Sequence, residues 1–410
     1  MAKARNIVLL CIAALIICGS LLTRVLVHFD VSFPEETGIG QTWRALEGRE
    51  VSATPQFSLA SFESGEFQDA VESYASDALP FHDQAMLLNA GLQEVGISQA
   101  AGLFGFDVYP TYLASNRLYI ASQDAVTYLP FEHTEYHDQK LTEYAQGLAK
   151  QAKAHPDKKF VVYMVQGFAE PSVNPANSLV GNVFLPQDEI AVFKAALGDC
   201  PNVSVLTDSY STLDEYYQDF FHSDHHWNAR GALRAYNTIA AELGLEQVDT
   251  STLTLRQVCS DVTFMGATSR WGRHVVNDAV MDVNIDYSGV SYKRGGKTLD
   301  GNDHSSYEAL SGDKKVYSFY DEYYDNIPQG VITGQGSGSA LLISNSYGGA
   351  IQRQLATQYA TLYKSTAMKA GHEDETLSGL IEKSGADTII FVANPTDFMT
   401  AAAVLPNFFD

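Results

Sequence analysis

The chain has 410 residues, enough for one large or two ordinary domains, and its 45% hydrophobic and 18% charged residues predict a globular protein with a full core. Its 49 acidic and 26 basic residues give a formal net charge of −23 at pH 7. A surface of that sign repels phosphate groups, which argues against nucleic acid or an anionic membrane surface as a ligand.

The first thirty residues predict an export signal. Lys3 and Arg5 precede an apolar run over 7–23, and this order of charge keeps the basic end in the cytoplasm while the rest crosses the membrane. No small-residue cleavage site follows the run, which favours an uncleaved signal anchor over residues 1–29. We therefore expect a single-pass protein of the cell membrane whose body, residues 30–410, lies on the extracytoplasmic side.

The predicted body contains only two of the four cysteines, Cys200 and Cys259. Two cysteines do not make a disulfide framework. Outside the cytoplasm they could pair, but two separate buried thiols fit the sequence equally well, so the pairing stays open.

The residues after the predicted anchor begin with a mixed helical part, about 30–130. Helical spacing predicts helices over 67–78 and 83–95, separated at Pro80. A strand is predicted over 116–122.

From residue 141 onward, predicted strands and helices alternate. Continuous apolar runs predict strands that are buried on both faces. Asn228 can cap a helix that ends before Gly244. This alternation predicts an α/β fold with a mainly parallel sheet covered on both faces. The predicted strands are 158–167, 202–208, 339–346 and 386–395, and the predicted helices are 141–154, 188–200, 229–243 and 350–365.

Residues 275–313 interrupt the alternation. They are polar, with short alternating runs and paired glycines. This composition predicts a β-rich or loop insert at the rim of the sheet, where loops often bind substrates.

Ser346 lies between a predicted strand and a predicted helix. A sharp turn there would expose its Oγ above the carboxyl edge of the sheet, and Gly348 and Gly349 permit the close backbone approach that such a turn needs. The N–H groups at the start of the helix could stabilise an oxyanion. The alternative is a serine that only caps the helix.

The segment Ser223–Trp227 reads SDHHW. In an extended segment alternate side chains share a face, so Asp224 and His226 would point the same way and the carboxylate would hold the imidazole in one tautomer. His225 would then point to the opposite side. A pair of capping and packing residues is one alternative, and a metal site that includes His222 is another. Because neighbouring side chains diverge in a strand and no further ligand group completes a site, we expect no metal.

Three segments resemble the bacterial DHHW protein family, in the family's order: FESGEFQDAVESYASDALPFHD, SDHHWNARGALRAY and LLISNSYGGA. That family is similar to the SGNH hydrolase-like domains of the alginate O-acetylation proteins. The resemblance covers most of the chain after the predicted anchor and implies an SGNH hydrolase-like three-layer α/β fold. It also implies a triad with Asp224 as the orienting acid, His226 as the base and Ser346 as the nucleophile. Asn345 stands where the family more often has Asp.

An active triad implies an acyl-enzyme and transfer of the acyl group to water or a sugar hydroxyl. The backbone N–H groups of Ser346 and Tyr347, next to Gly348, are the expected oxyanion donors. Asn394 and Gln166 end two predicted strands and could add side-chain contacts to the same site.

We therefore expect a serine-dependent O-acetyltransferase or acetylesterase that acts on cell-surface or secreted polysaccharide without a cofactor. A membrane-bound acyl-transfer partner could supply the acyl donor. The alternatives are a non-catalytic polysaccharide-binding or scaffold protein of an acetylation or export machinery, and a metallophosphoesterase.

Overall fold

The computed structural model describes residues 18–19, 22–23, 25–29, 31–34, 37–44, 46–167, 173–251, 254–258, 262–303, 315–316, 319–324, 327–368 and 375–410. Most of the predicted anchor lies outside these residues. Among the described residues, no helix combines the length and the apolar character that a membrane crossing requires. The chain forms two compact units. The first comprises Met1–Gly105, Pro110–Ser115 and Arg270–His274, and the second comprises Phe106–Tyr109, Asn116–Ser269 and Val275–Asp410.

The first unit is mainly helical. Helix α3 (Glu66–Asp77) and helix α4 (His82–Phe104) are separated around Pro80, as predicted, and α4 continues past residue 95 until Gly105, whose φ of 71° ends it. Helix α2 (Leu59–Ser64) precedes them, and β1 (Trp43–Arg44) pairs with β2 (Arg49–Glu50).

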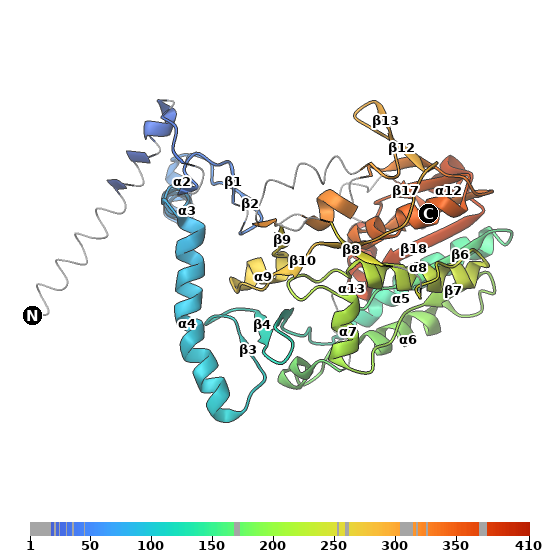
Figure 1. Cartoon of the computed structure of the whole chain (residues 1–410), viewed down its shortest axis with the longest axis horizontal. Coiled ribbons are helices and arrows are strands. Elements are labelled where there is room, and N and C mark those ends of the chain that lie inside the picture. Colours follow the sequence, from blue (N-terminus) through green and yellow to red (C-terminus); the bar gives the residue numbers. More distant parts are fainter. Residues whose placement is uncertain are drawn as a thin grey trace, which may run out of the picture. The chain divides into compact units, whose positions relative to one another are not determined.

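The second unit is organised around an eight-stranded sheet, of which Figure 1 labels β12, β13, β17, β18, β6 and β7. The strand order is β13-β12-β15-β17-β16-β18-β6-β7. The five strands from β17 to β7 are mutually parallel, whereas β15, β12 and β13 run antiparallel to their neighbours at one edge. The predicted mainly parallel sheet is therefore confirmed. The strands are β6 (Lys159–Met164), β7 (Val203–Leu206), β12 (Ser291–Arg294), β13 (Lys297–Asp300), β15 (Gly330–Thr333), β16 (Ser339–Ser344), β17 (Thr361–Ser365) and β18 (Thr388–Ala393).

Alternate side chains of the parallel strands enter two different cores. In β18, Ile390 and Val392 pack in one core with residues of α8, whereas Ile389 and Phe391 pack in the other with residues of α5, α6, α12 and α13. The sheet is thus covered on both faces, as the sequence predicts. The helices of this unit are α5 (Glu135–Ala154), α6 (Pro186–Leu197), α7 (Leu213–Asp219), α8 (Ala229–Leu243), α11 (Gln352–Gln358), α12 (Leu377–Ser384) and α13 (Pro395–Val404). Helix α9 (Ala267–Gly272) has residues in both units.

The predicted helix over 350–365 is wrong in its second half. Helix α11 ends at Gln358, and the chain then forms β17. This strand lies between β16 and β15 and hydrogen-bonds to both. Its Thr and Tyr side chains favour strands, and the backbone partners available on both sides decide between the two conformations.

Short elements complete the described part of the second unit. Residues 275–313 contribute β10, β11 and the β12–β13 hairpin, while 304–313 lie outside the described residues. Cys200 is a free, buried thiol, and Cys259 lies outside the described residues. The remaining elements are β3 (Val108–Pro110), β4 (Arg117–Ile120), β5 (Ala125–Tyr128), β8 (Leu255–Gln257), β9 (Thr263–Phe264), β10 (Asp278–Ala279), β11 (Met281–Val283), β14 (Lys315–Val316), η2 (Pro175–Leu179), η3 (Tyr320–Tyr324) and η4 (Ser346–Ala350).

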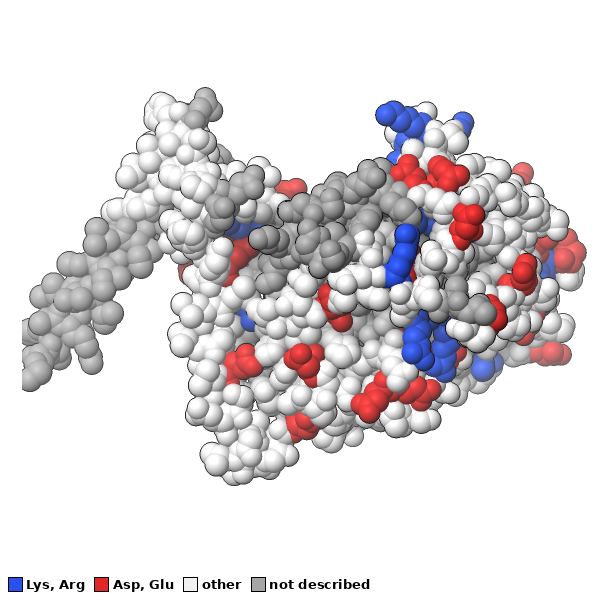
Figure 2. Space-filling model, in the orientation of Figure 1, with Lys and Arg blue, Asp and Glu red and all other residues white. Residues whose placement is uncertain are grey.

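Both acidic and basic side chains are exposed on the surface. On the face drawn in Figure 2, acidic side chains are scattered, whereas basic side chains gather at a few points, one of them on the β12–β13 hairpin. That hairpin exposes Lys293, Arg294 and Lys297. Among the described residues on this face, no broad basic surface is present that would attract a polyanion.

Candidate active site

Ser346 lies two residues after the end of the buried strand β16 and begins the 3₁₀ helix η4. Asn345 caps this turn, because its Oδ1 accepts the N–H of Tyr347 at 3.1 Å. Gly348 is needed at its position, since a Cβ there would lie 2.0 Å from Ser344 Oγ. The strand and the turn together place a half-buried Ser346 at the carboxyl end of a central parallel strand, as predicted.

Asp224 and His226 lie in the loop between α7 and α8. Phe220 forms an isolated antiparallel bridge with Trp227, so the loop folds back on itself. The N–H of Asn228, the residue that caps α8, donates to the carbonyl of Asp219 at 2.8 Å. These contacts close the loop at its base and hold the two side chains near its tip.

The structure brings Asp224, His226 and Ser346 together in one hydrogen-bonded series. His226 Nδ1 lies 2.6 Å from Asp224 Oδ1, and His226 Nε2 lies 2.7 Å from Ser346 Oγ. Asp224 is 7% exposed and His226 is 6% exposed. With the carboxylate ionised, Nδ1–H donates to Asp224, and Nε2 is left to accept the proton of the Ser346 hydroxyl. This arrangement allows His226 to act as a general base toward Ser346.

Backbone groups hold the Asp224 carboxylate. The N–H of His226 donates to Oδ1 at 3.0 Å, and the N–H of Ala267 donates to Oδ2 at 2.6 Å. Burial alone would raise the pKa of Asp224, but the charges of His225 and His226 and the hydrogen bonds from His226 and Ala267 outweigh it and hold this pKa below its ordinary value. Asp224 is therefore an ionised, fixed acceptor near neutral pH.

A second buried carboxylate, Asp278, fixes the start of the same loop. Its Oδ1 accepts the N–H of His222 at 3.0 Å, and its Oδ2 accepts the N–H of Ser223 at 2.9 Å. Burial raises the pKa of Asp278 above its ordinary value, against the lowering effect of these hydrogen bonds. Asp278 touches neither His226 nor Ser346 in the contacts described, so its role is to position the loop.

The expectation that His225 points away from Asp224 is wrong. The backbone over 222–226 is bent rather than extended, because the N–H of His226 turns back to the carboxylate of Asp224 two residues earlier. His225 Nδ1 consequently lies 3.4 Å from Asp224 Oδ1. One ligand atom from each of Asp224, His225 and His226 lies within 4.8 Å of the others, so divergence of neighbouring side chains no longer argues against a metal here.

Two aromatic rings confine the imidazole of His226. The ring of Tyr320 stacks on it with centroids 3.8 Å apart and planes at 11°, and the ring of His225 lies at 4.0 Å and 34°. Two rings cannot share one face at these distances, so they take opposite faces. This packing restricts rotation of the imidazole and supports the direction of Nε2 toward Ser346.

Tyr347 joins the serine turn to the histidine loop. Its hydroxyl donates to the carbonyl of His225 at 2.9 Å. Gly167 passes so close that a Cβ there would lie 2.1 Å from the Tyr347 hydroxyl oxygen and 2.7 Å from the His225 carbonyl oxygen. Any side chain at Gly167 would therefore push these two segments apart.

The predicted oxyanion donors are not all free. The N–H of Tyr347 donates to the side-chain Oδ1 of Asn345, and the N–H of Gly348 donates to the Asn345 carbonyl at 3.2 Å. The N–H of Ser346 makes no hydrogen bond to the described residues. It is thus the backbone donor of this turn that remains available.

The two predicted strand-end side chains make structural hydrogen bonds. Asn394 caps α13, since its Oδ1 accepts the N–H of Asp397 at 2.8 Å. Gln166 Nε2 donates to the carbonyl of Asp208 and lies 3.3 Å from Thr207 Oγ1. The structure connects neither side chain to Ser346 by a described hydrogen bond.

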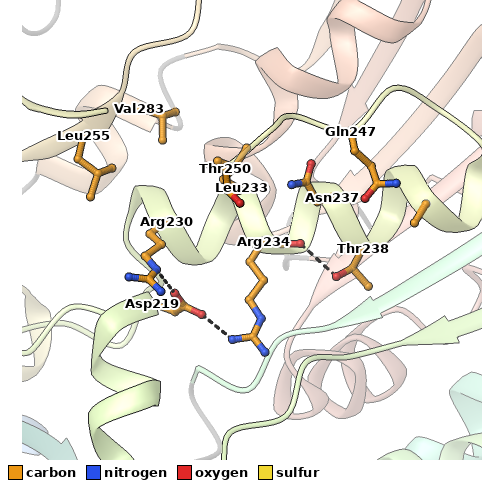
Figure 3. A pocket seen from close by; sticks show the side chains of 11 residues that line it. Asp219, Arg230, Leu233, Arg234, Asn237, Thr238, Gln247, Thr250, Leu255 and Val283 are labelled. Carbon is orange, nitrogen blue, oxygen red and sulfur yellow. Dashed lines mark hydrogen bonds and ion pairs between the residues drawn. The ribbon is translucent and has the colours of Figure 1, made fainter. Parts of the chain in front are cut away.

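A cavity of about 790 Å³ lies beside α8, and its lining does not include the triad residues (Figure 3). The carboxylate of Asp219 lies between two guanidinium groups, 3.3 Å from Arg230 Nε and 3.0 Å from Arg234 Nη1. Asp219 is thus paired with two basic side chains of α8, and Arg234 also lies 3.5 Å from Asp208 Oδ1.

Four residues that support the site were not predicted from the sequence: Tyr320, Gly266, Ala267 and Asp278. The N–H groups of Gly266 and Ala267 donate to Ser223 Oγ and Asp224 Oδ2, and a backbone donor is not marked by the residue type. At position 266 the glycine itself is required, because a Cβ would lie 2.2 Å from the Asp224 Cβ. Tyr320 belongs to the tyrosine-rich segment YSFYDEYYD, whose clustering of aromatic residues is the one signal that sequence offers.

No family model and no curated protein sequence matches the chain. Several solved structures resemble it. PatB1 from Bacillus cereus is 19% identical, with a TM-score of 0.49 over 67% of this chain and 96% of PatB1. A DHHW family protein from Eubacterium siraeum is 14% identical, with a TM-score of 0.49 over 72% of this chain and 96% of that protein. The O-acetyltransferase domain of AlgJ from Pseudomonas putida is 12% identical, with a TM-score of 0.36 over 72% of this chain and 92% of that domain.

A DHHW family protein and AlgJ are therefore among the structures that this chain resembles, as the sequence motifs predict. These similarities are distant.

Proposed function

We propose that the chain is an SGNH-like O-acyltransferase or acetylesterase that acts on a cell-surface or secreted polysaccharide. The observation that carries this proposal is the series of two short hydrogen bonds, 2.6 Å from Asp224 to His226 and 2.7 Å from His226 to Ser346. A hydroxyl, an imidazole and a buried carboxylate in this order form the constellation that activates a serine nucleophile on unrelated folds.

The chemistry follows from the positions of the donors and acceptors. Ser346 Oγ attacks the carbonyl carbon of an acyl ester while its proton passes to His226 Nε2. The N–H of Ser346 stabilises the oxyanion that forms. The C–O bond to the leaving alcohol then breaks, and His226 returns the proton to that alcohol. In the second half of the reaction a sugar hydroxyl or water gives its proton to His226 Nε2 and attacks the acyl carbon. The bond between that carbon and Ser346 Oγ then breaks, and His226 returns the proton to Ser346 Oγ.

The proposed polysaccharide substrate and the proposed location at the membrane are supported by the sequence. The motifs that resemble the DHHW family and the alginate O-acetylation proteins support a glycan as acyl acceptor or donor. The basic residues before the apolar run over 7–23 support a membrane anchor with the body on the extracytoplasmic side. A membrane-bound partner would then present the acyl donor to Ser346.

The first experiment treats the full chain with a chromogenic acetyl ester and measures both turnover and intact mass. We expect turnover, and one added acetyl group on the chain, for the wild type and neither for Ser346→Ala. Ser344→Ala is the matched control, because Ser344 lies two residues earlier in the same segment and is fully buried. A folded wild type without turnover and without an acetyl adduct contradicts the proposal.

The second candidate is a non-catalytic scaffold that binds polysaccharide through the same site. The observation that favours it is the use of the Tyr347 and Gly348 N–H groups by Asn345, which leaves fewer donors for an oxyanion. Glycan binding that persists in the triple variant Asp224→Asn, His226→Gln, Ser346→Ala, together with a wild type that lacks esterase activity, would support the scaffold.

A further inference from the structure

A second cluster of ionisable side chains lies outside the candidate active site. His133 precedes Thr134, the N-cap of α5, while Asp138 lies in the first turn of α5 and Glu189 in the first turn of α6. His133 Nε2 lies 2.8 Å from Asp138 Oδ1 and 3.5 Å from Glu189 Oε1. One ligand atom from each of the three side chains lies within 4.8 Å of the others.

Glu189 is the unusual member of this cluster. Its residue is 1% exposed, and neither carboxylate oxygen accepts a hydrogen bond from the described residues. A buried carboxylate without hydrogen bonds is costly, and proteins retain such a group mainly where it is paired or coordinates a metal. Burial raises the pKa of Glu189 to about 7, with a smaller lowering effect from His133.

We propose that His133, Asp138 and Glu189 bind one divalent metal ion, with Zn²⁺ as the ion that fits best. One imidazole nitrogen and two carboxylates are a ligand set that Zn²⁺ favours, whereas Mg²⁺ and Ca²⁺ favour oxygen ligands alone. Ligand atoms around a tetrahedral Zn²⁺ lie about 3.3 Å apart. The distances from His133 Nε2, 2.8 Å to Asp138 Oδ1 and 3.5 Å to Glu189 Oε1, lie on either side of that value.

The site has an entry path and a free position. The side chains of His133 and Asp138 are 28% and 39% exposed, so an ion can reach Nε2 from solvent. Three protein ligands leave the fourth position for water. Since α5 and α6 pack in the same core, an ion held by residues of both would tie the starts of these two helices together. None of the three ligands belongs to the triad, so this site does not depend on the proposed function.

The test uses the full chain after removal of metals with a chelator. Titration with Zn²⁺ followed by calorimetry should give one site per chain, and His133→Gln and Glu189→Gln should each weaken binding at least tenfold. Asp188→Asn is the matched control, since Asp188 is the exposed neighbour of Glu189 and lies outside the cluster. Its affinity for Zn²⁺ should equal that of the wild type. Co²⁺ in place of Zn²⁺ should give the visible absorption of a four-coordinate site.

Thermal unfolding provides a second readout. Zn²⁺ should raise the Tm of the wild type and leave the Tm of Glu189→Gln unchanged. Without metal, Glu189→Gln should be at least as stable as the wild type, because it removes a buried carboxylate that accepts no hydrogen bond. No binding of Zn²⁺ by the wild type overturns the proposal. Binding that survives Glu189→Gln and is lost in His225→Gln also overturns it, since the ion would then occupy the Asp224 cluster.

Discussion

The imidazole of His226 lies nearly parallel to the phenol ring of Tyr320, with their centroids 3.8 Å apart. Tyr320 begins the short helix η3, and its ring is almost fully buried. The contact covers one face of the base that touches Ser346. Tyr320 is therefore a positioning residue, which acts on the reaction only through His226.

Removal of the Tyr320 ring should lower the turnover of an acetyl ester. We expect Tyr320→Ala to reduce kcat about tenfold with little change in KM, because the imidazole gains rotational freedom while the ester still binds. Tyr320→Phe keeps the stacked ring and should keep the activity. Equal kcat values for Tyr320→Ala and the wild type, in folded protein, would show that the stacking does not position His226.

A side chain at Gly266 should displace Asp224. A Cβ at this position would lie 2.2 Å from the Asp224 Cβ and 2.4 Å from Oδ2, so we expect Gly266→Ala to destabilise the protein by about 1–3 kcal/mol and to reduce esterase turnover on the order of 100-fold. Gly96→Ala is the control, because a Cβ there meets no atom within 4 Å. Chemical denaturation and ester turnover of both variants provide the measurement, and unchanged turnover in Gly266→Ala would contradict the prediction.

Asn345 and Asp397 should behave as a coupled pair. Asn345 Nδ2 donates to Asp397 Oδ2, so Asn345→Asp would place two carboxylates side by side and destabilise the protein by about 1–3 kcal/mol at pH 8. The neighbouring charge would raise the pKa of the new carboxyl in the folded protein. The loss of stability should therefore grow as the pH rises through that pKa and be smaller at pH 5.

The exchanged pair provides the control for this prediction. In the double variant Asn345→Asp, Asp397→Asn, an amide again faces a carboxylate. Its loss of stability should be smaller than the sum of the two single losses. Additive losses would show that the two side chains do not interact.

Because of Asp77 in the first unit, the free energy of unfolding should decrease as the pH falls into the acid range. Its buried carboxylate accepts two hydrogen bonds from Arg49, at 3.0 and 2.8 Å, and one from the N–H of Ser52 at 2.8 Å. Burial alone would raise the pKa of Asp77, but these hydrogen bonds outweigh it and lower the pKa in the folded chain. The stabilisation is therefore complete above the unfolded pKa of about 3.9 and is lost as the pH falls through the folded pKa.

Asp77→Asn tests this dependence. We expect it to destabilise the protein by about 1–3 kcal/mol at pH 7 and by less at pH 3, where the wild type has begun to lose the same stabilisation. Asp69→Asn removes an exposed acid from the same helix and should change little at either pH. A difference between wild type and Asp77→Asn that stays constant from pH 7 to pH 3 would refute the assignment.

Local signals explain which elements could be predicted. Helix α8 has the predicted bounds because its ends are marked by residues that act on the adjacent backbone. Asn228 accepts the N–H groups of Arg230 and Gly231, and Gly244 takes a φ of 67° that ends the helix. Strands β6, β16 and β18 were predicted because burial on both faces leaves a continuous apolar run.

Other features depend on partners that lie far away in the chain. The segment Thr361–Ser365 has no Gly or Pro to separate it from α11, and its conformation is decided by the strands on either side. The orientation of His225 follows from the turn that the Asp224 carboxylate imposes, which spacing alone does not reveal. The engagement of the Tyr347 N–H follows from Asn345, a residue that sequence analysis had noted only as a departure from the family pattern.

His226 and Ser346 are 120 residues apart in the chain, yet their side chains meet at 2.7 Å. The contact requires β16 to be paired in the sheet and the loop before α8 to be closed, so local structure alone does not form it. A reagent that reacts with Ser346 only when His226 abstracts its proton would therefore label only molecules in which this contact has formed. Labelling at successive times during refolding would then measure when the contact between His226 and Ser346 forms.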